Sequence, residues 1–351
     1  MLAQQSTTKP DISPTPQPSG LQPSMSPPPP PPTVDSLAGL RALLRGPSRS
    51  REYNSYSGKI HTLKWSSDGS RLATGSVDRV VNLFSLDSGR LSKDVTFKGH
   101  TGSVDQLCWN PRHPSLLATA SSDKSLRLWD ARTQHSVATL VLRGENINVT
   151  WSPNGECIAV GNKEDLVSFV DVKTRKVARE EQFKLEVNEV SWNCTGDAFF
   201  MTTGLGSVQV FSYPDMQLET TLQAHPTNCI CLDFDRTGRY FATGAADALV
   251  TIWSATELAP LAASGRLEWP VRTISFSHDG QLLAAGSEDH FIDISHSATG
   301  EQVLQHATNN SSFTLAWHPR CYLLAYGADR DKYHDARDAA CVKTFSVAVE
   351  S

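Results

Sequence analysis

The chain has 351 residues, and its 39% hydrophobic and 8% aromatic content is enough to bury a substantial core. A formal net charge of -5 excludes a general attraction to nucleic-acid backbones, so nucleic-acid binding would need a local basic patch. Seven scattered cysteines without zinc-type spacing, and the lack of a signal peptide or of an apolar run of about 18 residues, predict a soluble intracellular protein without a membrane span.

Residues 1–35 contain eleven of the twenty prolines and almost no large apolar side chains. Because such a segment cannot bury enough surface to offset its chain entropy, we expect a disordered tail. The polyproline run at 27–32 leaves one alternative open, the docking of an SH3, WW or profilin-type groove.

Residues 36–47 predict a short helix followed by a linker. Ser36 is a suitable N-cap, a Gly-Pro pair ends the pattern, and three leucines, at 37, 40 and 44, fall on one face. Because an exposed leucine stripe is costly, we expect the helix to pack on the rest of the chain. Docking of a partner protein is the alternative.

From residue 48 onward the chain is organised by a repeat, in which an apolar run ends in an aromatic anchor every 41 to 44 residues. The seven anchors are Trp65, Trp109, Trp151, Trp192, Phe234, Phe276 and Trp317. A glycine follows four positions later in five repeats, which favours a hairpin turn. This period, with a Gly-His and a Trp-Asp pair in the second repeat, predicts an all-β fold, a seven-bladed WD40 β-propeller over residues 48–351.

The two ends of the repeat array predict how the ring closes. In a WD40 repeat the outermost strand of a blade precedes the next repeat, so the first repeat must begin with a strand of another blade. Residues 49–56 occupy that position, and the chain stops six residues after Phe345, before a fourth strand of the last blade. We therefore expect residues 49–56 to complete that blade and to leave no open sheet edge there.

Polar residues inside two repeats predict buried hydrogen-bond networks of the WD40 type. The two sets are His100, Thr119, Asp123 and Trp129 in blade 2, and His225, Thr243, Asp247 and Trp253 in blade 5. They resemble a hydrolase triad in composition only, because the indole gives the hydroxyl a partner and the order of the residues is structural. We therefore expect no catalytic residue, no enzyme activity and no cofactor.

The seventh repeat carries an insertion with four aspartates and one histidine, at 329–338. It lacks the glycine and the terminal glutamate of an EF-hand loop, so we expect a solvated loop rather than a metal site. No metal ligand is therefore predicted.

The loops between strands carry polar and aromatic residues that a propeller does not need. The loops after each outermost strand and the turns between second and third strands should open on one face of the ring. Loop variation in degenerate repeats is one explanation. The other is a partner-binding surface with Trp269 and Arg272 at its centre, since interfaces favour these residue types. Its predicted residues are Glu145, Asn146, Glu186, Asn188, Trp269, Arg272, Asp289 and His290.

Several of these segments resemble the THO complex subunit 3 family, in order and across residues 45–348. They include GSVDQLCW at 102–109, GENIN at 144–148, EVNE at 186–189, PTNCIC at 226–231, WPVRT at 269–273 and SEDHFID at 287–293. The resemblance implies a nuclear scaffold subunit in the THO part of the TREX assembly, which couples transcription to mRNA packaging and export. It implies other THO subunits as partners, above all a large helical scaffold subunit, and indirect contact with a DEAD-box RNA helicase and the mRNP. No strong direct binding of nucleic acid is expected.

A second hypothesis comes from residues 129–132, Trp-Asp-Ala-Arg, which match the WDxR box of WD40 substrate receptors of cullin-4 ubiquitin ligases. That function would need Arg132 to be exposed on the opposite face of the ring. Because the four-residue pattern is common among propellers, it is kept as the alternative.

Overall fold

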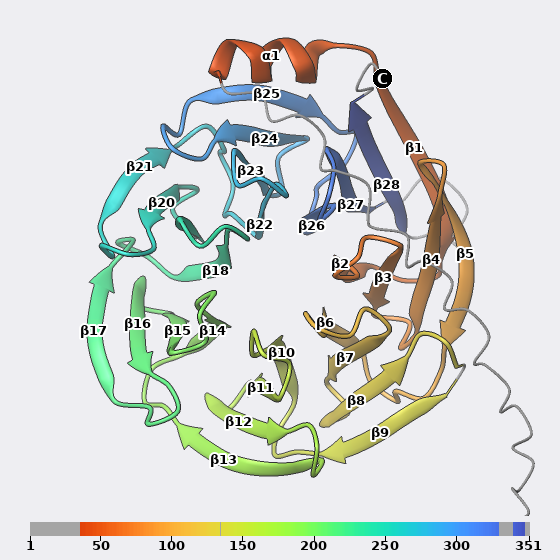
Figure 1. Cartoon of the computed structure of the whole chain (residues 1–351), viewed down its shortest axis with the longest axis vertical. Helices are drawn as coiled ribbons and strands as arrows, with labels where there is room; N and C mark the ends of the chain where they lie inside the picture. Colours follow the sequence, from red (N-terminus) through yellow and green to blue (C-terminus); the bar gives the residue numbers. More distant parts are fainter. Residues whose placement is uncertain (1–35, 134, 330–339, 348–351) are drawn as a thin grey trace, which may run out of the picture. The chain divides into compact units, whose positions relative to one another are not determined.

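The computed structural model describes residues 36–133, 135–329 and 340–347. Within them, 28 strands form seven four-stranded antiparallel sheets, and one helix precedes the strands. Figure 1 shows the sheets as blades around a central opening, with the first strand of each repeat innermost. The predicted all-β, seven-bladed propeller is confirmed.

The blades follow one another in chain order. Blades 1 to 4 are β2 (Ile60–Trp65), β3 (Arg71–Ser76), β4 (Val81–Asp87), β5 (Arg90–Phe97); β6 (Val104–Trp109), β7 (Leu116–Ser121), β8 (Ser125–Asp130), β9 (Ser136–Val141); β10 (Asn146–Trp151), β11 (Cys157–Asn162), β12 (Leu166–Asp171), β13 (Lys176–Gln182); and β14 (Val187–Trp192), β15 (Ala198–Thr203), β16 (Ser207–Ser212), β17 (Leu218–Gln223). Blades 5 to 7 are β18 (Cys229–Phe234), β19 (Tyr240–Ala245), β20 (Val250–Ser254), β21 (Pro260–Ser264); β22 (Thr273–Phe276), β23 (Leu282–Gly286), β24 (Phe291–His296), β25 (Gln302–Ala307); and β26 (Thr314–Trp317), β27 (Leu323–Asp329), β28 (Ala340–Val347), β1 (Ser48–Tyr56).

Each predicted anchor is the last residue of an innermost strand, and the tryptophan anchors are at least 95% buried. Three of their indole N–H groups donate to backbone carbonyls of the neighbouring innermost strand, Trp65 to Ala316 at 3.1 Å, Trp109 to Lys64 at 2.9 Å and Trp151 to Cys108 at 2.9 Å. These three anchors therefore fill the space between two blades and also tie them together.

The turn after each anchor depends on glycine where the backbone is left-handed. Gly69 has a φ of 76°, and a Cβ at this position would lie 2.3 Å from the His318 ring of blade 7. Both the backbone conformation and the close approach of the neighbouring blade require the missing side chain. The hairpins are thus shaped by turn chemistry and by blade-to-blade packing together.

The N-terminal strand completes the last blade. β1 pairs antiparallel with β28 from Ser48 opposite Val347 to Tyr56 opposite Ala340. Blade 7 thus takes three strands from the end of the chain and its outermost strand from the beginning. This pairing closes the ring, because the edge of β28 is covered by a strand of the same chain.

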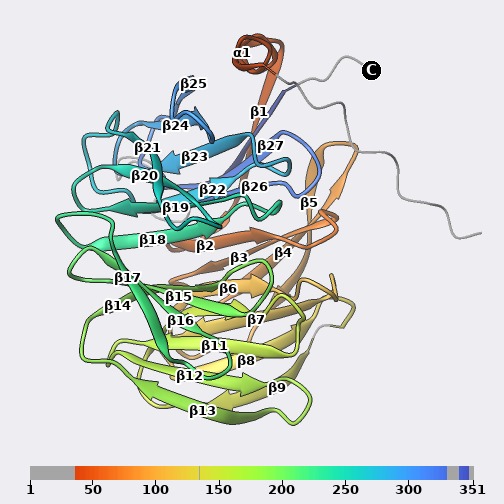
Figure 2. The same ribbon diagram turned by 60° about the vertical axis from the view of Figure 1, so that its left-hand side comes forward.

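The helix α1 (Leu37–Arg45) begins as predicted, with the Ser36 hydroxyl accepting a hydrogen bond from the backbone of the first turn. Leu40 and Leu44 are 0% and 2% exposed and join the apolar cluster of blades 6 and 7. The predicted leucine face therefore packs on the propeller, and Figures 1 and 2 show α1 beside β25.

A side chain of α1 also occupies the open edge of blade 6. The Arg41 guanidinium donates two hydrogen bonds, of 3.0 and 2.7 Å, to the Gln302 carbonyl at the start of β25. The helix thus protects an edge that would otherwise invite pairing with another chain. Within the part of the chain that the structure describes, no helix is long and apolar enough to cross a membrane.

Two predictions fall outside the described residues. The expected disordered tail covers residues 1–35, and the expected solvated loop of blade 7 covers nearly the same positions as the gap at 330–339. Both remain predictions.

Candidate partner-binding face

Two sets of loops open on the same face of the ring, as backbone hydrogen bonds between them show. The Ser122 N–H of a turn between second and third strands donates to the Ser103 carbonyl, in the loop that leads into β6, at 3.1 Å. Equivalent bonds run from Lys163 to Glu145 at 2.9 Å and from Gly204 to Glu186 at 3.0 Å. We call the surface formed by these loops and turns the loop face.

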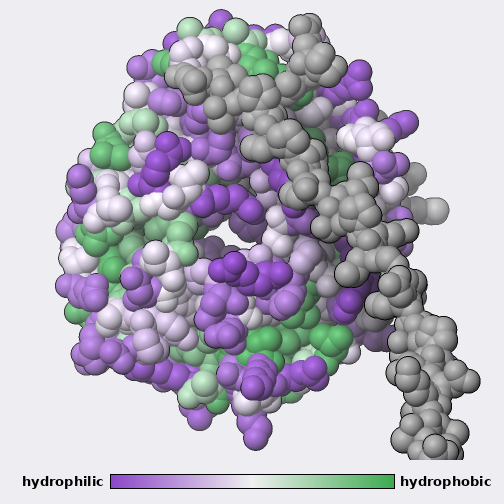
Figure 3. Space-filling model, viewed as in Figure 1, coloured by the Kyte–Doolittle hydropathy of each residue, from purple (hydrophilic) through white to green (hydrophobic). Residues whose placement is uncertain are grey.

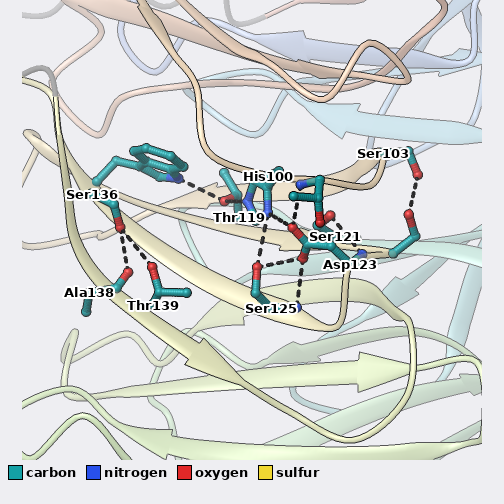
Figure 4. A network of polar contacts seen from close by, with 12 residues as sticks. His100, Ser103, Thr119, Ser121, Asp123, Ser125, Ser136, Ala138 and Thr139 are labelled. Carbon is teal, nitrogen blue, oxygen red and sulfur yellow. Dashed lines mark hydrogen bonds and ion pairs between the residues drawn. The ribbon is translucent and has the colours of Figure 1, made fainter.

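The predicted network of blade 2 holds one of these loops in place (Figure 4). The Trp129 indole donates to the Thr119 hydroxyl at 2.9 Å, and that hydroxyl lies 2.7 Å from His100 Nε2. His100 Nδ1 lies 2.9 Å from Asp123 Oδ2, which also accepts the Thr101 N–H at 2.9 Å. These contacts form one chain if the neutral imidazole accepts from the threonine and donates to the carboxylate.

The equivalent residues of blade 5 are joined in the same way. Trp253 donates to Thr243 at 3.1 Å, and His225 contacts Thr243 at 2.9 Å and Asp247 at 3.2 Å. In both blades the histidine is only 6% exposed and the threonine is fully buried. A substrate cannot reach either hydroxyl, so the arrangement suits a structural role.

Burial and hydrogen bonding fix the protonation states of the blade 2 network. Desolvation lowers the pKa of His100, against the opposing influence of Asp123, so the imidazole is neutral near pH 7. Burial alone would raise the pKa of Asp123, but hydrogen bonds from Ser125, Thr101 and His100 lower it overall. The carboxylate is therefore a permanent acceptor for the loop.

Substitution of Asp123 by alanine is expected to lower the free energy of unfolding by about 1–3 kcal/mol, because His100 and the Thr101 N–H lose a buried acceptor. Chemical denaturation at pH 7 measures the change. Because the pKa of Asp123 is lowered on folding, its contribution is present above about pH 4 and is lost only as the pH falls further.

The exposed Asp87 provides a control, and its replacement by alanine should change stability by less than about 0.5 kcal/mol. Equal stability of the Asp123 and Asp87 variants would show that the network does not hold the loop.

The innermost strands share an irregularity where they meet the loop face. In blades 1, 2, 3 and 5 the pairing register shifts around the residue four positions before the anchor, and in blade 4 it shifts over that residue and the next. Such a bulge leaves one residue out of the ladder and re-aims its side chain. In blades 6 and 7 the equivalent residue comes directly before the strand. These seven mouth residues are His61, Asp105, Ile147, Asn188, Ile230, Arg272 and Phe313.

The mouth residues surround the end of the central channel and differ in chemistry. Ile147, Ile230 and Phe313 are half-buried and apolar. His61 Nδ1 lies 3.0 Å from Asp105 Oδ1, which joins the innermost strands of blades 1 and 2. Figure 3 shows the opening at the centre of the ring, with hydrophilic residues around much of it. The three apolar residues were missed by the sequence analysis, although their common position four residues before an anchor could have identified them.

Trp269 stands on the loop that enters blade 6. Its side chain is 53% exposed, while the backbone N–H groups of Glu268 and Trp269 donate to the Asp289 carboxylate at 3.1 and 3.2 Å. Val271, two residues further on, is fully buried. The loop backbone is therefore fixed on both sides of an indole that remains in solvent, which reduces the entropy lost on binding.

Four other predicted partner-binding residues also reach the surface. Arg272 is exposed and donates to Glu288 at 2.9 Å. Glu145 is half-buried and pairs with Lys163, and Glu186 and His290 are exposed. Together with Trp269 they give the loop face an aromatic group, an arginine and several carboxylates.

Three of the predicted residues have another role. Asn146 and Asp289 are only 1% and 8% exposed, so the expectation that their side chains contact a partner is corrected. The backbone of Asn146 pairs with β11. The Asp289 carboxylate accepts hydrogen bonds from the loop that carries Trp269. Asn188 is half-buried and donates to Asn228 Oδ1 at 2.9 Å and to a blade 5 carbonyl at 3.0 Å, so it joins two blades.

Deeper in the channel, one glutamine connects three blades. Gln106 of blade 2 donates to both carboxylate oxygens of Glu189 in blade 4, at 3.1 and 2.8 Å, and accepts the Val149 N–H of blade 3. Burial raises the pKa of Glu189 to about 7, although the bond from Gln106 opposes the shift. Among the described residues, no group of three or more His, Cys, Asp or Glu side chains is placed to hold a metal ion.

Comparisons with known proteins place the chain in a family. Residues 56–327 match the family model of the THOC3 beta-propeller domain. THO complex subunit 3 of Arabidopsis thaliana is 47% identical over 282 residues, which cover 80% of this chain and 90% of the relative. The WD repeat-containing protein AAC3 of Dictyostelium discoideum is 28% identical over 77% of this chain and 62% of its own length.

Among solved structures, the Cps50 (Swd1) β-propeller domain of Myceliophteria thermophila superposes with a TM-score of 0.73 at 18% identity. The match covers 86% of this chain and all of that domain, and it supports the fold alone. The family model and the Arabidopsis relative together show that the chain belongs to the THO complex subunit 3 family.

Proposed function

We propose that this protein is a non-catalytic WD40 scaffold subunit of the THO part of the TREX complex, and that it works in the nucleus, where transcription is coupled to mRNA processing and export. Membership of the THO complex subunit 3 family supports this function. The other THO subunits are its direct partners, and the DEAD-box RNA helicase and the mRNP are reached through them.

The observation that carries the proposal is the presentation of Trp269. A half-exposed indole on a backbone fixed by Asp289 is an interface feature, because the propeller itself gains nothing from leaving it in water. Arg272, in the same loop, is one of the mouth residues, so the indole stands close to the channel rim. We assign this part of the loop face to a segment of the large helical THO subunit.

The mixture of apolar and charged residues on the loop face favours an amphipathic helix of the partner as the ligand. Apolar side chains of a helix would pack against Trp269 and the half-buried isoleucines of the mouth, Ile147 and Ile230. The Arg272–Glu288 pair would lie at the edge of the contact, where it selects for complementary charge. Glu145, Glu186 and His290 extend the same polar rim.

A scaffold without catalysis is consistent with the buried networks. The histidine–hydroxyl–carboxylate sets predicted in blades 2 and 5 belong to closed loops, and their histidines are 6% exposed. These sets contain the hydrogen-bond donors and acceptors of a hydrolase triad, but a substrate cannot reach their buried hydroxyl groups.

Affinity purification from nuclear extract tests the assignment. The tagged full-length chain is expected to recover the large helical THO subunit in stoichiometric amount, as measured by quantitative mass spectrometry. Retention of the complex after nuclease treatment would show that the contact is between proteins. Recovery of no THO subunit would contradict the proposal.

One observation keeps the ubiquitin-ligase alternative testable. The Arg132 side chain is 74% exposed, as a WDxR receptor requires, although its guanidinium is held by Asp130 at 2.7 Å. The same purification decides between the two functions. Recovery of the cullin-4 adaptor in place of THO subunits, with loss of the adaptor in an Arg132→Ala variant, would support the alternative.

A further inference from the structure

A cluster of positive charge lies on the rim of the propeller, away from the loop face residues considered so far. Residues 36–53 contain four arginines and a single acid, whereas the whole chain has a net charge of -5. Two further cations come from the beginning of β5. We call the group Arg45, Arg49, Arg51, Arg90 and Lys93 the basic stripe.

Contacts between β1 and blade 1 bring these residues together. The Arg51 guanidinium donates to the Gly89 carbonyl, next to Arg90. The Tyr53 hydroxyl accepts the Leu91 N–H at 3.1 Å. The stripe therefore runs from the end of α1 along β1 to the start of β5, and Figure 1 shows β1 and β5 on the same side of the ring.

The acids near the stripe offset its positive charge only in part, and one of them, the exposed Asp87, lies opposite Arg90 in the β4–β5 ladder. Glu52 pairs with Lys343 at 3.6 Å, and Asp94 lies 3.9 Å from Arg71, so both acids already have basic partners. Within the described part of the chain, no ion pair involves Arg45, Arg49 or the two cations of β5, and all four are exposed. These four cations can therefore form new charge-assisted hydrogen bonds without breaking existing ion pairs.

The composition of the stripe favours a phosphate ligand over a protein ligand. Protein interfaces have an apolar centre. The exposed large hydrophobic residues of the described chain are Val77, Val141, Val177, Leu205, Leu218, Leu261 and Trp269. None of them lies on α1, β1 or β5, and four of the five cations are arginines, which suit phosphate oxygens through their planar fork of donors.

We propose that the basic stripe binds the phosphodiester backbone of nucleic acid, independently of base sequence. Tyr53, the aromatic residue of the stripe strands whose side chain the structure describes, offers no free ring on which a base could stack, because its hydroxyl and ring are engaged with blade 1. Binding by phosphate contacts alone is weak, with a dissociation constant on the order of 10⁻⁴–10⁻⁶ M at physiological salt. This agrees with the expectation that the propeller is no strong nucleic-acid binder, and it would add a direct contact with the transcript to the proposed scaffold function.

The test replaces two exposed arginines of the segment from α1 to β1, in the full-length variant Arg45→Gln/Arg49→Gln. Fluorescence anisotropy with a labelled oligouridine of about 20 nucleotides measures binding from about 50 to 200 mM salt. The wild type is expected to bind at low salt and to weaken as salt rises. The variant should bind about tenfold more weakly at low salt, and its slope of log K against log salt should fall by about 1.4, for two lost phosphate contacts.

A matched control changes the net charge by the same amount elsewhere. Lys98→Gln/Lys184→Gln removes two exposed lysines of the loop face and should bind oligouridine like the wild type. Equal melting temperatures of the three proteins exclude unfolding as the cause. Equal RNA affinity of the stripe variant and the wild type would overturn the proposal.

Competition identifies the chemistry of the ligand. Unlabelled duplex DNA should compete, because it offers the same phosphodiester groups, whereas polyglutamate of equal charge should compete at least about tenfold less well. If polyglutamate competes as well as RNA, the stripe binds acidic protein and the proposal is wrong. The stripe variant should still co-purify with THO subunits, so a failure of RNA binding leaves the proposed scaffold function intact.

Discussion

Deletion of residues 46–58 is expected to convert the protein into aggregating material and to abolish its cooperative melting transition. The deletion removes β1 and exposes the edge of β28, whose residues are mostly buried and apolar. An unpaired strand edge of this kind pairs with other chains, and blades 1 and 7 lose their connection through the Tyr53 contacts. Size-exclusion chromatography and differential scanning calorimetry measure the effect.

Deletion of residues 1–34 is the matched control, because it retains α1 and β1. We expect this shorter protein to elute and to melt like the full chain. If both deletions leave the same melting temperature and the same elution profile, β1 is not needed for closure.

The variant Trp269→Ala/Arg272→Ala is expected to lose co-purification with the THO core. Truncation of an aromatic and arginine centre costs about 2 kcal/mol or more in binding, which corresponds to a loss of roughly 30-fold or more in affinity. The melting temperature should stay nearly unchanged, because exposed substitutions outside the packed strands rarely exceed about 0.5 kcal/mol. Quantitative mass spectrometry of the purified complexes and a thermal shift measurement check both parts.

A control of similar exposure is available outside the loop face. Leu218 is 53% exposed, like Trp269, and lies on the outermost strand of blade 4. The variant Leu218→Ala/Arg132→Ala removes the same kinds of side chain and should assemble normally. If the Trp269 variant assembles as well as this control, the partner binds the rim, α1 or the opposite face instead.

The sequence predicted the elements that depend on local chemistry. The spacing of the anchors located the last residue of each innermost strand, because each anchor ends its strand and is followed by a turn. The start of α1 at Ser36 and its leucine face could likewise be predicted, because helix capping and the 3.6-residue period depend on residues that are close in sequence. The position of residues 49–56 in the array also indicated that they complete blade 7.

The candidate site was harder to predict, because burial depends on pairing between distant segments. Asp289 looks like a surface carboxylate in the sequence, yet it accepts two N–H groups from a loop twenty residues earlier. Ile147 and Ile230 look like core residues, yet each lies at a bulge of an innermost strand and is only half-buried. The basic stripe consists of residues from α1, β1 and β5, and no local sequence pattern predicts that these elements lie side by side.

The ribosome synthesises β1 long before the strand with which it pairs. β1 emerges before every blade, but its partner β28 emerges after blades 1 to 6, about 300 residues later. If the blades fold in the order of their synthesis, β1 has no strand partner while the first six sheets form. Ser48–Tyr56 contains two arginines and few apolar residues. This composition disfavours aggregation and pairing with the edges of other blades before β28 has been synthesised. The charge pattern of β1 therefore serves the growing chain as well as the finished ring.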